Sequence, residues 1–362
     1  MAVSKEQVKE VLSKIVDPAT GRDYVASKEV KDVRVNGEIV AIDIELGYPA
    51  DNVLETIRQQ VAGPVAALAG VTRVDVAITV KIVAHLAQRG LKLIPGVKNL
   101  IAVASGKGGV GKSTTAVNLA LALAAEGASV GILDADIYGP SMPMMLGLDG
   151  KPESRDGKTM QPMERHGVKA MSIGLLIPAD QPMVWRGPMV TQALEQLLRD
   201  TQWGELDYLV VDLPPGTGDI QLTLAQKVPV TGAVIVTTPQ DIALIDARKG
   251  LKMFEKVNVP ILGVVENMST HICSNCGHEE HIFGSGGAAR MGADYQVEVL
   301  GSLPLDIRIR EQTDSGRPTV VAEPSSRIAQ VYGEIARAVA ARIGALQQDR
   351  SGAFPKIVVQ NT

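Results

Sequence analysis

The sequence predicts an α/β protein in which helices cover both faces of a parallel sheet, preceded by a small α+β domain. Five apolar runs rich in β-branched residues are spread over residues 100–268, and stretches with helical spacing, such as 113–127 and 246–257, separate most of them. Before these runs, shorter segments alternate apolar and polar residues. Continuous apolar strands separated by helices are typical of a parallel sheet that is buried on both sides.

The first elements predict a small domain in the order α-β-β-α-β. Ser4 and Gln7 have the spacing of a capping box, which predicts a helix that ends near Asp17-Pro18. Asn36-Gly37 is flanked by alternating residues on both sides, which indicates a β-hairpin. A second helix and a third strand are expected over residues 51–69 and 71–83.

Changes of composition divide the chain into four parts. We expect the α+β domain to span residues 1–88 and a linker with Gly90, Pro95 and Gly96 to span residues 89–97. The sheet domain is then expected over residues 98–345, followed by a flexible tail over residues 346–362.

Composition excludes several classes of protein. The chain has 362 residues, 45% of them apolar, and a net charge of -4, so a general nucleic-acid-binding surface is not expected. It begins without the long apolar segment of a signal peptide and contains no apolar run long enough to span a membrane. Only two cysteines are present, which argues against a disulfide-rich secreted protein. We therefore expect a soluble cytoplasmic protein that binds neither nucleic acid nor membrane.

A glycine-rich loop is the strongest functional signal. Gly106, Gly111, Lys112 and Ser113 match the phosphate-binding pattern G-x-x-x-x-G-K-[ST], between an expected strand and an expected helix. In such a loop, backbone amides and the helix N-terminus face phosphate oxygens. Lys112 would reach the β- and γ-phosphates, and Ser113 would bind Mg²⁺.

Three carboxylates stand at the ends of apolar strands. Asp212 follows one strand and is placed to hold the Mg²⁺ shell, as a Walker-B aspartate does. Asp134 and Asp136 end the strand before it, where Asp134 could bind metal and Asp136 could position water. The alternative is that these two carboxylates only cap a strand end in solvent.

The second lysine of GKGGVGKST, Lys107, resembles that of the deviant Walker A motif in the class of MinD, ArsA and the nitrogenase iron protein. DADIYGPS, DLPPGTGD and the late CSNC resemble, more narrowly, the Mrp/ApbC iron–sulfur cluster carrier ATPases. The resemblance covers about residues 98–345, and residues 1–88 resemble the MIP18-like domain often fused ahead of it.

This resemblance implies a homodimer that binds ATP and Mg²⁺ and hydrolyses ATP slowly. Lys107 would cross the dimer interface to the partner's nucleotide, acting with Lys112 and Asp136 in catalysis, as an arginine finger does in related enzymes. Asn267 matches the family's adenine-contacting asparagine. The alternatives are a solvated loop lysine and an asparagine that caps a strand. The nucleotide-binding residues expected in this way are Gly106, Lys107, Gly108, Gly109, Val110, Gly111, Lys112, Ser113, Thr114 and Asn267.

The only two cysteines, Cys273 and Cys276, form a C-x-x-C pair. A [4Fe–4S] cluster takes four thiolates, which two facing copies of the chain would supply. This agrees with the resemblance, in which such a pair bridges a cluster between subunits. A zinc site that adds His278 and His281, a redox pair and two inert thiols are the alternatives.

The resemblance therefore implies an ATP-hydrolysing carrier that receives iron–sulfur clusters from scaffold proteins and passes them to apo-proteins. A regulatory switch of the MinD/ParA type with structural zinc at the cysteines is a second hypothesis. An adaptor whose ATP site has lost activity is a third.

Overall fold

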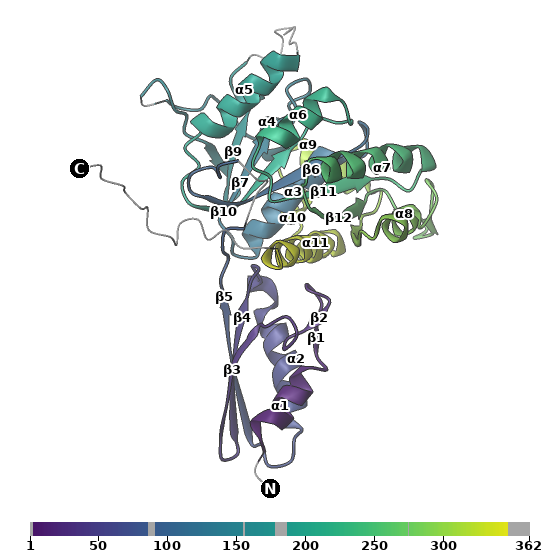
Figure 1. Ribbon diagram of the computed structural model, residues 1–362. Helices are drawn as coiled ribbons and strands as arrows, with labels where there is room; N and C mark the ends of the chain where they lie inside the picture. The colour runs from purple at the N-terminus through teal and green to yellow at the C-terminus, as the bar shows by residue number, and fades with distance from the viewer. Residues whose placement is uncertain (1–2, 86–90, 155, 178–186, 274, 347–362) are drawn as a thin grey trace, which may run out of the picture.

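A computed structural model describes residues 3–85, 91–154, 156–177, 187–273 and 275–346. Its larger part is built on one eight-stranded sheet, and a narrower N-terminal part extends from it (Figure 1). Residues 347–362 of the expected tail and residues 89 and 90 of the expected linker lie outside the described residues.

The large sheet is parallel except at one edge, where β8 runs antiparallel to β9. In spatial order its strands are β15 (Val299–Ser302), β12 (Ile261–Glu266), β11 (Gly232–Thr237), β6 (Val97–Ala104), β10 (Leu206–Asp212), β7 (Val130–Asp134), β9 (Val168–Ser172) and β8 (Met163–Arg165). The five central strands are almost entirely buried, which explains their continuous apolar sequences.

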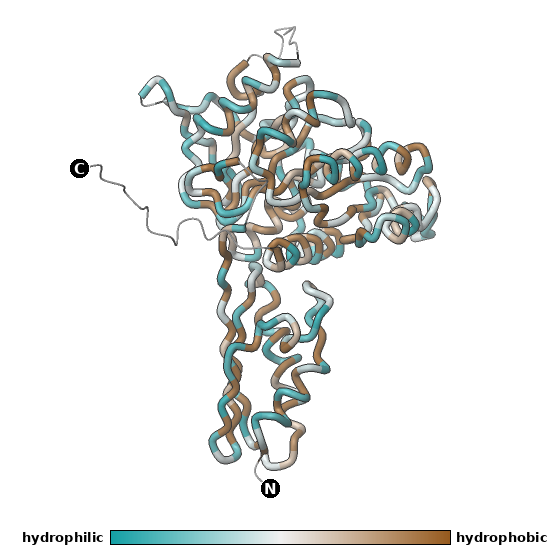
Figure 2. The backbone as a smooth tube through the Cα atoms, viewed as in Figure 1, coloured by the Kyte–Doolittle hydropathy of each residue, from teal (hydrophilic) through white to brown (hydrophobic). Residues whose placement is uncertain are grey.

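Helices cover both faces of this sheet, so the predicted fold class is confirmed. Alternate residues of β6 belong to two separate cores: Ile101 and Val103 lie in one, and Ala102 and Ala104 lie in the other. The first core contains α3 (Lys112–Ala125), α4 (Met142–Leu146), α9 (Ile307–Asp314), α10 (Thr319–Ala322) and α11 (Arg327–Gly344). The second contains α5 (Gly187–Asp200), α6 (Asp219–Lys227), α7 (Asp241–Lys256) and α8 (Gly287–Tyr295). Figure 2 shows hydrophobic segments gathered within these layers.

The N-terminal part has the predicted order of main elements. Its three-stranded sheet consists of β3 (Val30–Asn36), β4 (Ile39–Leu46) and β5 (Arg73–Val80), and it packs with α1 (Lys5–Leu12) and α2 (Leu54–Ala66). The hairpin at Asn36-Gly37 is confirmed, with Gly37 at φ 63°. The 3₁₀ turn η1 (Asp51–Val53) leads into α2.

The predicted end of the first helix was wrong. The capping box of Ser4 and Gln7 is present, but α1 ends at Leu12. The chain then forms the small antiparallel pair β1 (Val16–Asp17) and β2 (Arg22–Asp23), which buries Asp17. Pairing with a later segment therefore overrides the local helical pattern after Leu12.

The two parts of the molecule are joined by polar contacts at the C-terminal end of α3. The backbone amide of Asn52 donates to Oε2 of Glu126 over 3.1 Å, and its side chain donates to the carbonyl of Ala125 over 3.0 Å. Arg337 of α11 forms an ion pair with the same glutamate, which is 2% exposed. One continuous apolar core runs through both parts behind these contacts. No described helix is long and apolar enough to cross a membrane.

Candidate functional site

The predicted phosphate loop runs from the end of β6 to the start of α3. Gly111 has φ 82° and immediately precedes Lys112, the first residue of α3. A Cβ at Gly111 would lie 2.1 Å from Nδ2 of Asn267, so neither the left-handed backbone nor the close neighbour tolerates a side chain. The first amides of α3 lie beside this loop, where a helix N-terminus attracts anions.

Lys112 reaches the end of β10. Its Nζ lies 2.5 Å from Oδ1 of Asp212 and 3.1 Å from Oγ of Ser113. The lysine is 6% exposed and the aspartate is fully buried. Burial raises the pKa of Asp212 above its usual range, while the attraction of Lys112 acts in the opposite direction. Oδ2 of Asp212 is buried without a hydrogen-bond partner among the described residues, which leaves one carboxylate oxygen for a ligand.

Strand register brings Asp134 next to Asp212. β10 lies between β6 and β7, and Asp212 is paired across the sheet with Asp134 at the carboxyl end of β7. Oδ2 of Asp134 accepts hydrogen bonds from the amides of Ser141 and Met142 and from the hydroxyl of Ser172. Burial and the neighbouring Asp212 raise the pKa of Asp134 to about 7. In this arrangement Asp134 anchors the start of α4, and a metal would compete with those donors.

The remaining predicted residues surround the loop. Asp136 is half-buried, which raises its pKa, and its Oδ1 accepts a bond from the amide of Gly139 over 3.3 Å. Lys107 is partly exposed, and its carbonyl accepts a bond from the hydroxyl of Ser105 over 2.8 Å. Nδ2 of Asn267 donates to the carbonyl of Val110 over 2.9 Å, which ties the end of β12 to the phosphate loop.

The other loop residues differ in exposure. Gly108 and Gly109 are exposed, and a Cβ at either would meet nothing within 4 Å. Gly106, by contrast, packs so closely on α7 that a Cβ would lie 2.2 Å from the backbone of Asp246. Thr114 lies in the first turn of α3, where its carbonyl accepts from Asn118.

Two polar residues at this edge were not singled out from the sequence. Ser172 ends β9 and is 1% exposed, with its hydroxyl 2.9 Å from Asp134. A polar residue at the end of an apolar strand is the same signal that pointed to Asp134. Gln221 donates to the carbonyl of Pro215 over 2.5 Å and fixes the turn that follows Asp212. It lies inside α6, where no pattern distinguishes it.

The cysteine pair lies in a short hairpin, between β13 (His271–Ile272) and β14 (Glu279–Glu280). Cys273 is partly exposed and Cys276 is exposed, and both thiols are free. The amide of Cys273 donates to the carbonyl of His278 over 2.9 Å, and the amide of Gly277 donates to the carbonyl of Cys273 over 2.8 Å. Backbone hydrogen bonds from Cys276 and Asn275 lower the pKa of the Cys273 thiol. The turn therefore favours the thiolate, the form that binds metal.

The nearby histidines do not join the cysteines. Nδ1 of His281 lies 2.9 Å from the carbonyl of Ser269, and Nε2 of His278 faces Glu280 at 3.7 Å. Among the described residues, no three side chains of histidine, cysteine, aspartate or glutamate gather as a metal site would require.

Comparison with known proteins identifies both parts of the chain. A family described as NUBPL iron-transfer P-loop NTPase matches residues 96–340. A family described as iron-sulfur cluster assembly protein matches residues 5–76.

Relatives extend over nearly the whole chain. An iron-sulfur cluster carrier protein from Salmonella typhimurium is 52% identical over 333 residues, which are 92% of this chain and 90% of that protein. Another from Pseudomonas fragi is 63% identical over 271 residues, 74% of this chain and 94% of that protein. Among solved structures, a nucleotide-binding protein from Archaeoglobus fulgidus in complex with ADP is 39% identical, with a TM-score of 0.57. The match covers 66% of this chain and 93% of that one.

Proposed function

The chain belongs to the family of NUBPL-type iron-transfer P-loop NTPases, and from this we propose that it carries iron–sulfur clusters and transfers them to apo-proteins. Its cargo would come from cluster scaffold proteins. We propose that this cluster transfer takes place in the cytoplasm, where thiols stay reduced. We further propose that the N-terminal 88 residues form a docking module, joined through residues 89–97 to a carrier domain over residues 98–345.

The phosphate loop supports nucleotide hydrolysis, for which we propose ATP as substrate and ADP and phosphate as products. Lys112 would neutralise the β- and γ-phosphates, and Asp136 would position the attacking water. Lys107 of a second copy would add positive charge as the γ-phosphate leaves. We propose that Asn267 contacts the adenine while it holds the loop through Val110.

The residues at the loop fit a magnesium ion. Ser113 supplies a hydroxyl beside Lys112, and Asp212 supplies a buried oxygen that has no other described partner. Hard oxygen ligands of this kind suit Mg²⁺, which neutralises phosphate charge when bound. We assign Ser113 and Asp212 to its shell. Asp134 is the further candidate, although its oxygens already accept hydrogen bonds from the protein.

The cargo site is proposed to form between two copies of the chain. Each copy offers two accessible thiols in a turn that stabilises the Cys273 thiolate. Two facing hairpins would supply the four thiolates of a [4Fe–4S] cluster. The exposed side chains of Ile272 and Ile282 flank the cysteines and would be buried by such a contact.

The observation that best supports the proposal is that the segment after β12 connects the phosphate loop with the cysteine hairpin. Asn267 holds the phosphate loop, and the same segment leads directly into the hairpin of Cys273. Just after Asn267, the amide and hydroxyl of Ser269 both donate to the carbonyl of Leu303, which fixes the base of the hairpin. A change at the phosphate loop therefore has a short, hydrogen-bonded route to the cysteines.

The alternative of a regulatory switch with structural zinc has less support. It would need His278 and His281 to leave their present contacts and turn toward the thiols.

The proposed function is tested by cluster transfer. The chain is loaded with iron and sulfide without oxygen, and an apo-dehydratase that requires a [4Fe–4S] cluster is added with an iron chelator present. Recovery of dehydratase activity despite the chelator is expected. Activity that appears equally with free iron and sulfide, or not at all, would contradict the proposal.

Two variants serve as controls. Cys273→Ser/Cys276→Ser should abolish transfer, because the cargo loses its thiolates. Lys112→Ala should retain the cluster but lose any effect of ATP on the transfer rate.

A further inference from the structure

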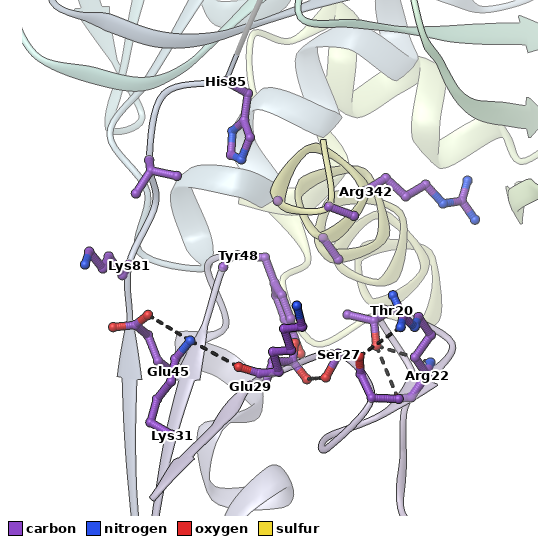
Figure 3. A pocket seen from close by; sticks show the side chains of 17 residues that line it. Thr20, Arg22, Ser27, Glu29, Lys31, Glu45, Tyr48, Lys81, His85 and Arg342 are labelled. Carbon is purple, nitrogen blue, oxygen red and sulfur yellow. Dashed lines mark hydrogen bonds and ion pairs between the residues drawn. The ribbon is translucent and has the colours of Figure 1, made fainter. Parts of the chain in front are cut away.

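A polar pocket lies between the N-terminal part and the end of α11 (Figure 3), and none of its lining residues belongs to the phosphate loop or the cysteine hairpin. Its volume is about 590 Å³, within the range of small-molecule sites, which often lie between domains. One wall comes from β2, the segment before β3, and the ends of β4 and β5. The other comes from the last turn of α11, where Gly344 and Gly47 approach so closely that a Cβ on Gly344 would lie 3.2 Å from the carbonyl oxygen of Gly47.

Positive charge dominates the wall from the N-terminal part. Lys31 is paired with Glu45 at 3.3 Å, so this pair is neutral. Lys28 and Lys81 also line the pocket, and in the described part of the chain neither side chain makes an ion pair. The Arg22 guanidinium donates only to a backbone carbonyl, that of Ala26, over 2.8 Å. Three cationic side chains thus remain without a carboxylate partner.

Negative charge in the pocket is weaker than the positive charge of these three side chains. Glu29 is the one unpaired carboxylate lining the pocket; it is 6% exposed, and burial raises its pKa to about 7. It therefore carries only part of a negative charge at neutral pH. In the last turn of α11, the carbonyls of Ala341, Arg342 and Ile343 already accept hydrogen bonds from the amides of Ala345 and Leu346. Arg342 points away from the pocket, toward Glu298 and the carbonyl of Leu262 (Figure 3).

A buried polar atom at the pocket also lacks a partner. His85 is 1% exposed, and its Nε2 forms no hydrogen bond with a described residue. Burial lowers the pKa of the ring, while Asn99 and the backbone of Gly344 act in the opposite direction, so the ring is neutral. Its Nδ1 lies 3.1 Å from Oδ1 of Asn99, whose Nδ2 donates to the carbonyl of Val83. This fixed amide makes Nδ1 the donor, so Nε2 of the neutral ring is an acceptor. A ligand hydroxyl would satisfy it.

We propose that this pocket binds a small organic anion that carries a hydroxyl group, with its carboxylate or phosphate at Lys28, Lys81 and Arg22 and its hydroxyl at His85. Occupation would bridge the N-terminal part and α11. The site is separate from the nucleotide and cluster sites of the proposed function, so each stands or fails independently.

Isothermal titration calorimetry on the full chain tests the proposal, with ADP already bound at the phosphate loop and ionic strength held constant. Citrate is the carboxylate probe and glycerol 3-phosphate the phosphate probe. Saturable binding of at least one is expected, and the stronger of the two identifies the anionic group. No saturable binding of either at millimolar concentration would overturn the proposal.

Variants locate the binding. Lys28→Gln/Lys81→Gln should raise the Kd at least about tenfold, because two of the three unpaired cations are lost. The matched control, Lys9→Gln/Lys14→Gln, removes the same charge from two exposed positions, one on α1 and one just after it, and should leave the Kd unchanged. Equal weakening by both pairs would show a general charge effect and overturn the assignment.

The hydroxyl contact has its own probe if citrate is the ligand that binds. Tricarballylate has the three carboxylates of citrate without its hydroxyl, and should bind about five- to tenfold more weakly because Nε2 of His85 stays unsatisfied. His85→Phe should remove this difference between the two anions. Equal affinity of citrate and tricarballylate in the unmodified chain would overturn the role of His85.

Discussion

Lys112 and Asp212 form a buried ion pair that joins the phosphate loop to the end of β10, with Nζ and Oδ1 2.5 Å apart. Lys112, which is expected to bind phosphate, thus lies against Asp212, which is expected to bind Mg²⁺. The pair links the first residue of α3 to the last residue of β10.

Removing the lysine alone should destabilise the nucleotide-free chain. Lys112→Met leaves the buried Asp212 without its cation, which should lower the free energy of unfolding by about 3 kcal/mol at pH 8. Lys112→Met/Asp212→Asn should recover part of this loss, because no uncompensated charge remains. Urea denaturation measures both, and a single variant as stable as the unmodified chain would show that the pair is solvated.

Lys107 can be assigned to its own site or to that of a partner by mixing variants. Lys107→Ala and Lys112→Ala should each hydrolyse ATP at least tenfold more slowly than the unmodified chain. If Lys107 acts across a dimer, an equal mixture regains one intact site in each mixed dimer, about a quarter of full activity. If it acts within its own chain, the mixture regains nothing.

Glu29 should make stability fall as the pH rises. Its pKa is raised from 4.5 to about 7 by burial, so between these values the folded chain binds more protons than the unfolded chain. Stability from this group is full below about pH 4.5 and is lost by about pH 7, a change of about 3 kcal/mol. Glu29→Gln should flatten this part of the pH profile of urea unfolding. Glu6→Gln, at an exposed position of α1, should leave the profile unchanged.

Arg337 should contribute more to the free energy of unfolding than Arg327, which lies on the same helix. It pairs with Glu126, which is 2% exposed and also binds the amide of Asn52. Arg337→Met leaves that carboxylate buried and should cost about 3 kcal/mol of unfolding free energy. Arg327→Met breaks an exposed pair with Glu334 and should cost less than about 1 kcal/mol. Equal effects would mean that Glu126 does not clamp the two parts together.

Much of the fold follows from local patterns in the sequence. The apolar β-branched runs became the central strands because strands buried on both faces need apolar residues throughout. Asn36-Gly37 marked a hairpin because its turn requires a left-handed backbone. The rule that ligands gather at the carboxyl ends of strands placed Asp134 and Asp212 at one edge, where they lie side by side.

Other features depend on contacts between distant segments, which leave no local pattern. The helix after Ser4 stops early because Val16-Asp17 pairs with Arg22-Asp23. The contact of Asn52 with Glu126 joins residues 74 positions apart in the sequence. The pocket beside His85 likewise exists only after the end of α11 has docked. The roles proposed for Lys107 and the cysteines involve a second chain, so one chain alone leaves them as predictions.

We propose that two copies of the chain hold an iron–sulfur cluster through Cys273 and Cys276. The most direct measurement is the iron and sulfide content per dimer after anaerobic reconstitution, for the unmodified chain and for Cys273→Ser/Cys276→Ser. About four of each per dimer are expected, lost in the double variant. Chains that bind no iron and instead hold about one zinc ion each would contradict a cluster shared by two copies.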